Sequence, residues 1–283
     1  VIGVALNMDR VVPGIQAACS SLARGNGSKA AEAIMTTDPF PKERAVRVTT
    51  PRGSFSVGAM AKGSGMIEPH MATMLGFIAT DAQVTPALLH RALVESARDT
   101  FNAITVDGEC STNDALLAMA SGTSGIAIDE ELYPALLDGL LSVSEPLALD
   151  IVRGGEGATK LIAVSVYDAR SIDEARQVAR TIANSPLVKT AVHGGDPNWG
   201  RLIAVAGRAG VGFALERARV TIGPIVLFSE GRPFDERAPE AATYLKNAEI
   251  ALAVDLGVGD ASATVWTCDL SAEYVRINAE YRT

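Results

Sequence analysis

The chain has 283 residues, of which 48% are hydrophobic and 20% are charged, which suits one large domain or two ordinary ones and argues against wholesale disorder. Its 25 basic and 33 acidic residues give a net charge of −8, which argues against nonspecific binding to nucleic acid or to an anionic membrane, although a local basic pocket stays possible. No uninterrupted apolar run approaches the roughly 20 residues that a membrane-spanning helix needs.

Disulfide and metal chemistry find little support in the sequence. The three cysteines, Cys19, Cys110 and Cys268, are odd in number and far apart, which suits a reducing compartment better than a disulfide framework. The cysteines form no CxxC pair and the three histidines form no HxxxH pair, so no structural zinc site is predicted. We therefore expect a cytoplasmic protein without a bound metal.

The N-terminal part is predicted to be a short strand followed by two helices. The first residues, VIGVAL, are typical of a strand that continues from something upstream, and they lack the charged flank of a signal peptide. Asp9 is placed to cap a helix over residues 11–22. A second, short helix is predicted over residues 28–35.

A hairpin and three helices are predicted in the middle of the chain. Residues 46–49 and 55–57 alternate around a Pro-Arg-Gly turn, which is a hairpin pattern. Thr85 and Pro86 then open an amphipathic helix. Its apolar residues recur at every fourth position: Leu89, Leu93, Ala97 and Phe101. Two further helices are expected over residues 130–141 and 146–152.

The second half of the chain is predicted to mix strands with one well-marked helix. Residues 160–167 alternate as a strand, and Ser171 with Glu174 forms the capping box of the next helix. After Pro186 the pattern indicates mostly strands, over residues 202–205, 220–222, 225–228, 251–255 and 263–268.

The order of these elements predicts a layered α/β protein. The composition changes around GGEG at residues 154–157, where a helical half gives way to a mixed half. We therefore divide the chain into a core over residues 1–153 and a mixed α/β region over residues 154–283.

One segment, KGSGMIEPHMATML at residues 62–75, combines glycines with a lone lysine and a threonine. A threonine hydroxyl is a poor nucleophile unless a base takes its proton, and cleavage of the peptide bond before it would supply its own α-amine as that base. Such an amine titrates at about 7.7–8.0, so a useful fraction is neutral at cellular pH. The small Ala72 before Thr73 suits such a cleavage, but the composition alone favours a Met-rich buried turn.

Three other motifs are ambiguous on composition alone. GGEGATK at residues 154–160 departs from the phosphate-binding GxxxxGK[ST] pattern, so it predicts no known nucleotide loop. His193 begins the turn-rich HGGDPNWGR, where it is a base candidate without a visible partner or part of a hydrogen-bonded loop. In STND, residues 111–114, the side chains are expected to cap a helix over residues 115–120, and Asp107 and Glu109 to form a solvated acidic loop.

The C-terminus, YVRINAEYRT at residues 274–283, alternates like a strand that ties the end of the chain down. In that arrangement Asn278 and Thr283 would line a pocket. A surface tail fits the composition equally well.

Six segments together resemble the ornithine acetyltransferases, also called glutamate N-acetyltransferases, of arginine biosynthesis. They occur in the family's order and cover essentially the whole chain. The segments are IMTTDPFPK (34–42), KGSGMIEPHMATML (62–75), STNDALL (111–117), GGEGATKLI (154–162), NSPLVKTAVHGGDPNWGR (184–201) and YVRINAEYRT (274–283). The resemblance implies an α-β-β-α layered fold shared with some self-processing aminopeptidases.

The resemblance also implies roles for individual residues. Thr73 matches the nucleophile, and the bond between Ala72 and Thr73 matches the one that the family cleaves in itself. Residues 1–72 would then be the downstream part of an α chain, and the β chain would begin at 73. The remaining matches are substrate contacts: Thr36 or Thr37, Lys62, Glu156, Asn278 and Thr283. Glu156 also matches a catalytic residue.

The implied reaction is a cofactor-free, ping-pong transfer of acetyl from N2-acetylornithine to glutamate through a threonyl ester, in a catalytic core formed by residues 1–153. Whether acetyl-CoA also donates is left open. The family further implies α/β heterodimers that assemble into a heterotetramer, without nucleic acid or membrane partners.

One departure from the family pattern bears on the activity of this chain. The Thr-Gly pair that forms the family's oxyanion hole directly before the VIGVAL strand is not in this sequence. Loss of one such donor typically lowers turnover by about 10²–10³. The departure makes an inactive truncated subunit one alternative. A second alternative, independent of it, is a self-processing amide hydrolase of related fold, with water as the acceptor.

Overall fold

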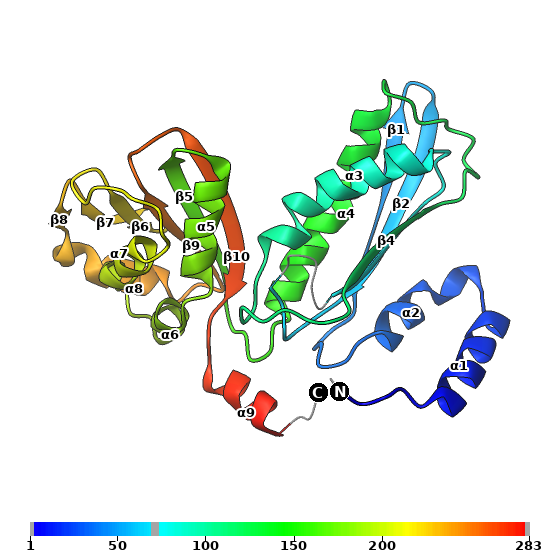
Figure 1. The fold of residues 1–283 in the computed structure, drawn as a ribbon, viewed down its shortest axis with the longest axis horizontal. Coiled ribbons are helices and arrows are strands. Elements are labelled where there is room, and N and C mark those ends of the chain that lie inside the picture. Colours follow the sequence, from blue (N-terminus) through cyan, green and yellow to red (C-terminus); the bar gives the residue numbers. More distant parts are fainter. Residues whose placement is uncertain (1–2, 69–73, 281–283) are drawn as a thin grey trace.

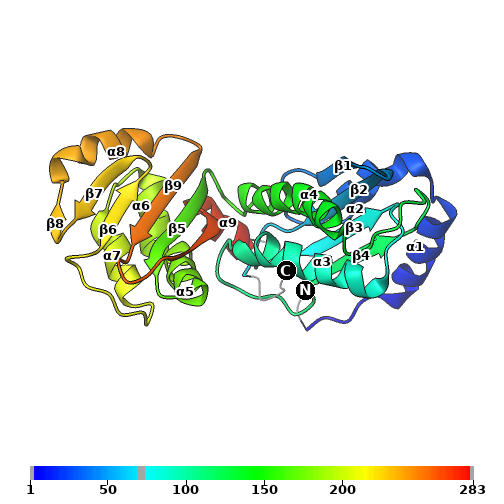
Figure 2. The ribbon, with the colours of Figure 1, turned by 90° about the horizontal axis from the view of Figure 1, so that it is seen from above.

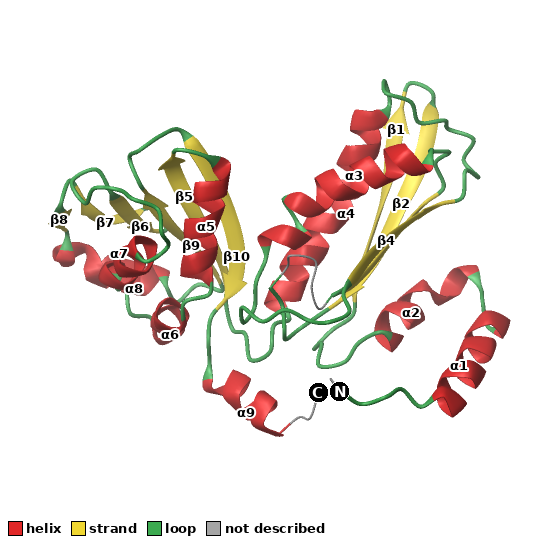
Figure 3. Ribbon diagram, viewed as in Figure 1, coloured by secondary structure: helices red, strands yellow, loops and turns green. Residues whose placement is uncertain are grey.

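Two β-sheets organise the chain, one built by its first half and the other by its second half (Figure 1). The computed structural model describes residues 3–68 and 74–280. Helices and strands occur in both halves, which confirms the predicted mixed α/β class (Figure 3). Ala72, Thr73 and Thr283, three of the predicted site residues, lie outside the described residues.

The first sheet has four strands in the order β1-β2-β3-β4. The pairs β1–β2 and β2–β3 are antiparallel, and β3–β4 is parallel. Helices α3 and α4 pack together on one face, where Phe55 and Val57 of β2 meet Leu136 and Leu140 of α4 (Figures 1 and 2). The bounds are β1 Lys42–Thr50, β2 Gly53–Lys62, β3 Leu75–Thr80, β4 Ala115–Ala120, α3 Pro86–Arg98 and α4 Tyr133–Arg153, with the 3-10 turn η2 at Phe101–Ala103.

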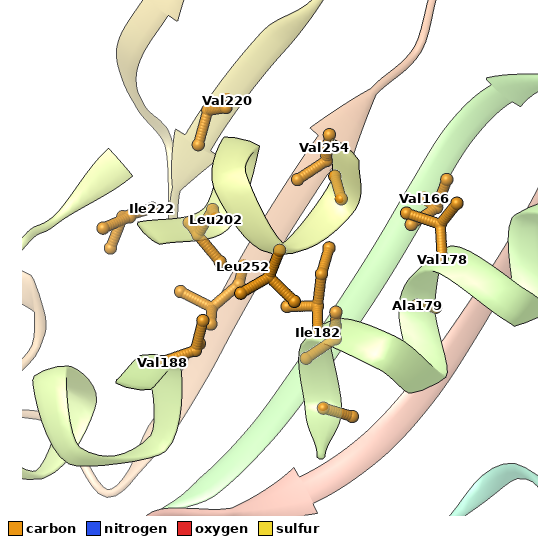
Figure 4. Packing of buried hydrophobic residues seen from close by; sticks show 14 of the residues in the cluster. Val166, Val178, Ala179, Ile182, Val188, Leu202, Val220, Ile222, Leu252 and Val254 are labelled. Carbon is orange, nitrogen blue, oxygen red and sulfur yellow. The ribbon is translucent and has the colours of Figure 1, made fainter. Parts of the chain in front are cut away.

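The second sheet has six strands in the order β10-β5-β9-β6-β7-β8. Its strands are β5 Leu161–Ala169, β6 Arg219–Ile222, β7 Ile225–Ser229, β8 Arg232–Pro233, β9 Glu249–Asp255 and β10 Ala261–Cys268. The helices of this half are α5 Ile172–Ala183, α6 Pro186–Gly194, α7 Trp199–Gly207 and α8 Ala238–Tyr244, after the turn η3 at Asp235–Arg237. The core lies between sheet and helices, where Val166, Leu252 and Val254 of the strands meet Val178 and Ile182 of α5 (Figure 4).

A smaller core joins the two halves. The end of α4, with Leu147 and Ile151, packs with Ile104 of the first half and with Leu161 and Cys268 of the second sheet. Ile104 also forms a β-bridge with Trp266, and the backbone N–H of Thr105 donates to the carbonyl of Trp266 at 2.8 Å. The loops that follow β2 and α4 are therefore held near the start of the second sheet.

Three helices lie outside these layers. At the N-terminal end, α1 (Met8–Ser20) has no buried residue, and α2 (Gly27–Ala33), preceded by the turn η1 (Arg24–Asn26), buries only Ala31 (Figure 1). At the C-terminal end, α9 (Ala272–Glu280) follows β10. Among the described residues, none of the helices is long and apolar enough to span a membrane.

Several local predictions are confirmed. The hairpin is β1–β2, and α3 begins after Thr85, whose hydroxyl accepts from the backbone N–H of Leu88 at 3.3 Å. The capping box is half formed, because Ser171 Oγ accepts from Glu174 N–H at 3.2 Å. The helices predicted over residues 130–141 and 146–152 are one continuous α4 with Pro146 inside it.

Five predictions are wrong, some of them because a longer-range constraint overrides the local pattern. Residues 202–205 lie in α7, where Asn198 caps the helix and Leu202 and Val205 form its buried face. Residues 115–120 form β4, because they pair with β3 despite their helix-favouring composition. The described part of residues 274–283 is helical in α9, and residues 3–6 form no strand. The first helix begins at Met8, capped by Asn7 in place of Asp9.

The division of the chain at residues 153 and 154 stays a prediction. The last residue of α4 is Arg153, and the strands of the second sheet begin at Leu161. The junction core described above crosses that point, so the two parts share buried contacts.

We expect Leu140→Ala to lower the free energy of unfolding by about 2–5 kcal/mol, because this fully buried α4 side chain would leave a cavity against the first sheet. Chemical denaturation measures the change. The matched control is Leu187→Ala, since Leu187 is 59% exposed and its loss should cost less than about 0.5 kcal/mol. Equal effects of the two changes would contradict the assigned core.

Candidate functional site

The Gly-rich turn after β2 contacts the loop that follows α4. Ser64 Oγ donates to the carbonyl of Gly154 at 2.7 Å, and the N–H of Glu156 donates to the carbonyl of Ser64 at 3.1 Å. A Cβ on Gly65 would lie 2.5 Å from the Glu156 carboxyl, closer than any side chain can approach. The glycine at 65 therefore leaves room for the Glu156 carboxyl to lie directly against the turn.

Glu156 is nearly buried and contacts the C-terminal helix. Its Oε2 accepts from Asn278 Nδ2 at 2.7 Å, across 122 positions of sequence. Glu156 is 7% exposed, and α9 is held beside it because Ser271 Oγ donates to the carbonyl of Gly157 at 2.6 Å. Gly157 has a φ of +69°, and a Cβ there would lie 2.5 Å from the backbone nitrogen of Tyr274, so only glycine suits this position.

A buried ion pair links the TTDP segment to the same turn. Asp38 Oδ1 accepts from Lys42 Nζ at 2.7 Å, and both side chains are completely buried. The same carboxylate accepts from the N–H of Gly63 at 2.7 Å and from that of Thr36 at 3.2 Å. Burial alone would raise the pKa of Asp38, but the hydrogen bonds from Gly63 and Lys42 outweigh it and hold the pKa below its usual value.

Asp107 anchors the second half of the turn. Its carboxylate accepts from the N–H groups of Met66 and Ile67 at 2.7 and 3.0 Å, and from the Tyr274 hydroxyl of α9 at 3.1 Å. Met66 has a φ of +58°, which is unusual for a side chain of this size. Burial and the nearby Asp107 carboxylate both raise the pKa of the Tyr274 hydroxyl, so Tyr274 stays a donor.

Asp269 anchors the loop from residues 154 to 160. It accepts from the N–H groups of Thr159 and Lys160 at 2.7 and 2.8 Å and from the Thr159 hydroxyl at 2.5 Å. His193 Nδ1 lies 2.6 Å from Asp269 Oδ2. Burial would raise the pKa of Asp269, but the bonds from Thr159 and His193 lower it, so the carboxylate is charged. Asp269 is thus the hydrogen-bond partner of His193 that the sequence did not reveal.

The predicted site residues that the structure describes thus come from four segments, which the bonds described above link to one another. Lys62 ends β2 directly before the Gly63 contact of Asp38, and Glu156 contacts Asn278. Thr36 is exposed and Thr37 is half-buried, and the backbone of Thr36 is the one bonded to Asp38. The roles of these residues stay predictions, as do those of Ala72, Thr73 and Thr283, which lie outside the described residues.

Sequence reasoning missed the residues that hold the site together. Asp38, Lys42 and Asp269 were not singled out, and Asp107 was expected in a solvated loop, whereas it caps the turn from residue 66. A weak signal was available for Asp38, because Asp before Pro is typical of a turn whose carboxylate bonds nearby backbone groups. No pattern in the sequence marks a carboxylate whose partners are 100 positions away.

Comparisons with known proteins all point to one family. The ArgJ family matches residues 1–283. The arginine biosynthesis bifunctional protein ArgJ of Symbiobacterium thermophilum is 49% identical over 288 residues, covering 100% of this chain and 71% of that protein. The protein of the same name from Chlorobium chlorochromatii is 48% identical, covering 100% of this chain and 66% of its own length. A crystal structure of the arginine biosynthesis bifunctional protein argJ from Bacillus halodurans has a TM-score of 0.71 at 42% identity, covering 74% of this chain and 100% of that one.

We expect Lys42→Met to lower the free energy of unfolding by about 3–5 kcal/mol, because it leaves the Asp38 carboxylate buried without its cation. In the double variant Asp38→Asn/Lys42→Met no buried charge remains, so urea unfolding should show a smaller loss than for Lys42→Met alone. Arg52→Met, which breaks an exposed pair with Asp129, is the control and should change little. A double variant less stable than Lys42→Met would contradict the argument.

The same pair predicts a pH dependence. Because the folded pKa of Asp38 is depressed, its contribution to stability is present above the unfolded value of 3.8 and is lost as the pH falls through the lower folded value. The stability difference between wild type and Asp38→Asn, measured by urea unfolding from pH 7 to pH 2.5, should therefore shrink at the acid end. A difference that stays constant to pH 2.5 would show that the charge of Asp38 contributes nothing.

Proposed function

This chain belongs to the ArgJ family, and from that premise we propose that it works in arginine biosynthesis as a glutamate N-acetyltransferase. It would move the acetyl group of N2-acetylornithine to glutamate. The names of the relatives support the pathway. Glu156 contacts Asn278 through its side chain and Ser64, two residues after Lys62, through its backbone, which supports a site for a small charged amino acid.

The proposed nucleophile is Thr73, freed by cleavage of the bond after Ala72. Thr73 directly precedes Met74, and the backbone of Met74 accepts from Ala115 N–H at 3.1 Å, so the start of β3 is pinned to β4. The neutral α-amine of Thr73 would take the proton of its own hydroxyl as Oγ attacks the acetyl carbonyl. The amide bond of the substrate breaks, and its nitrogen takes that proton from the Thr73 amine. The products are a threonyl ester and free ornithine.

In the second half-reaction the α-amine of glutamate attacks the threonyl ester and leaves with the acetyl group. The threonine hydroxyl is regenerated, so the cycle balances without a cofactor. Acetyl-CoA would form the same threonyl ester if it also donated, and the proposal does not require this second donor.

The charged residues would orient both substrates. The Lys62 ammonium suits a substrate carboxylate, and the Glu156 carboxylate suits a substrate amine or a proton transfer to it. Glu156 is the strongest support for the proposal, because it is 7% exposed and, within residues 3–68 and 74–280, its carboxylate has one hydrogen-bond partner, the Asn278 amide, which leaves lone pairs for a ligand. Thr36 or Thr37 and Thr283 would complete the contacts.

The same reasoning extends to assembly. Cleavage before Thr73 would leave an α and a β chain joined by the β2–β3 pairing, in which Lys62 lies opposite Leu75. These α/β heterodimers would pair into a heterotetramer, located in the cytoplasm with the rest of the pathway.

We expect intact-mass spectrometry under denaturing conditions to find a fragment that begins at Thr73. Thr73→Ala should remain a single uncut chain, since it removes the attacking hydroxyl. Thr80→Ala is a matched control, because this β3 threonine donates to a backbone carbonyl within the sheet. A Thr73→Ala chain that is still cut at this bond would exclude the proposed self-processing.

We expect Glu156→Gln to lower transfer of labelled acetyl from N2-acetylornithine to glutamate by roughly 10²-fold or more, the usual range for a proton-transfer group. Processing and thermal stability should change little, because a glutamine keeps the Asn278 contact. Release of free acetate in place of acetylglutamate by the wild type would favour the amide hydrolase. Undiminished transfer in Glu156→Gln would remove this residue from the mechanism.

A further inference from the structure

The backbone of the Gly-rich turn is held firmly shortly before the proposed cleavage bond. The Asp107 carboxylate accepts from the N–H groups of Met66 and Ile67 at 2.7 and 3.0 Å. The carbonyl of Ile67 accepts in turn from the N–H of Val106 at 2.8 Å. Hydrogen bonds therefore set the path of the turn up to the residue before Glu68.

The side chain of Glu68 extends this anchor to the second half of the chain. Glu68 Oε1 lies 3.1 Å from Nη1 of Arg180, which belongs to α5 and thus to the helix that packs on the second sheet. Glu68 is 8% exposed, and the side chain of Arg180 is 19% exposed. Because both charges are largely removed from water, each depends on the other as its partner.

The guanidinium of Arg180 is itself fixed by backbone at the junction of the two halves. Its Nη2 donates to the carbonyl of Asn102 at 2.5 Å, and its Nη1 donates to the carbonyl of Ile104 at 3.4 Å. Ile104 also forms the β-bridge with Trp266 of the second sheet. A planar guanidinium bonded in this way can orient Glu68 from a position that both halves determine.

Arg176, one turn earlier on α5, gives a matched comparison. Its Nη2 lies 2.6 Å from Asp99 Oδ1, so it also joins α5 to the first half. Within the residues that the structure describes, neither member of that pair bonds to the Gly-rich turn. The two arginines therefore separate contact between the halves from contact with the turn.

We propose that Arg180 is a positioning residue for self-cleavage and that it acts through Glu68. The cleavage itself rests on the proposed function. Because Arg180 lies on α5, the ion pair makes the anchor before the cleaved bond depend on the packing of the second half against the first. The chain would then cut itself rapidly only when both halves have folded together.

The cleavage is an attack of the Thr73 hydroxyl on the carbonyl carbon of Ala72. The bond between that carbon and the Thr73 nitrogen breaks, the hydroxyl proton passes to the nitrogen, and water hydrolyses the resulting ester. Glu68 lies four positions before Ala72, and the carbonyl of Met74 accepts from Ala115 N–H at 3.1 Å, so the chain is held on both sides of the bond. Holding both sides lowers the entropy cost of the attack.

The rate of cutting is measured on newly made chains in cell-free translation, by intact-mass spectrometry over time. We expect Arg180→Met to slow the cut by roughly tenfold to a hundredfold, because small displacements of reacting groups have effects of that order. Arg180→Lys should recover part of the rate, since its ammonium can still pair with Glu68. Arg176→Met should match wild type, and a cut in Arg180→Met as fast as that of wild type would overturn the proposal.

Two further variants separate positioning from stability. Leu140→Ala weakens the core of the first sheet without touching the turn, so it should cut at close to the wild-type rate. The double variant Glu68→Gln/Arg180→Met should be no slower than Arg180→Met, because the two residues act as one unit. If Leu140→Ala is slowed as much as Arg180→Met, or if the double variant is slower still, the positioning role through Glu68 is overturned.

Hydrogen exchange separates this proposal from the proposed function, because it needs no cleavage. In the uncut Thr73→Ala chain, Arg180→Met should raise the exchange rates of the Met66 and Ile67 amides severalfold, and Arg176→Met should leave them unchanged. Unchanged exchange in Arg180→Met would overturn the anchor. If wild type is never cut while the exchange rates respond to Arg180→Met, self-cleavage fails as a function and the anchor of the turn stands.

Discussion

The buried ion pair between Asp38 and Lys42 is the interaction on which the geometry of the candidate site depends. Its carboxylate also binds the N–H groups of Thr36 and Gly63, and its ammonium lies beneath Gly154, where an added Cβ would approach Lys42 Nζ to 3.1 Å. Burying two charges costs several kcal/mol each, which their attraction and added hydrogen bonds must offset. The pair therefore contributes more to the position of the loops than to the stability of the fold, because it holds three loops together at one point.

Loops need such anchors because they cannot use sheet or helix hydrogen bonds. The turn from residue 63 to 68 and the loop from 154 to 160 both run through the interior, where each unpaired N–H group would be costly. Asp107 and Asp269 satisfy these donors, and glycines at 65 and 157 permit the close approach that side chains would block. The carboxylates and the glycines answer one requirement, which is to bring backbone segments into contact without leaving polar groups unpaired.

This arrangement explains which features the sequence could predict. Caps and short-range periodicity identify α3 and α5, because Thr85 and Ser171 bond to groups three residues away. The segment from 115 to 120 has the composition of a helix, and only pairing with β3 makes it a strand. The site motifs are recognisable as a set through the family resemblance, yet the contact of Glu156 with Asn278 depends on where α9 packs, which no local pattern encodes.

The four aspartates near the site then fall into two kinds that their hydrogen bonds distinguish. Asp38 and Asp269 are saturated with donors, so their pKa values stay low and they remain charged at neutral pH. Asp107 binds both backbone groups and the Tyr274 hydroxyl, and it too is occupied. Asp114 is only half-buried, and its buried Oδ2 has no hydrogen-bond partner among the described residues. The number of donors around each carboxylate therefore decides whether it can hold loops in place, as Asp38, Asp107 and Asp269 do.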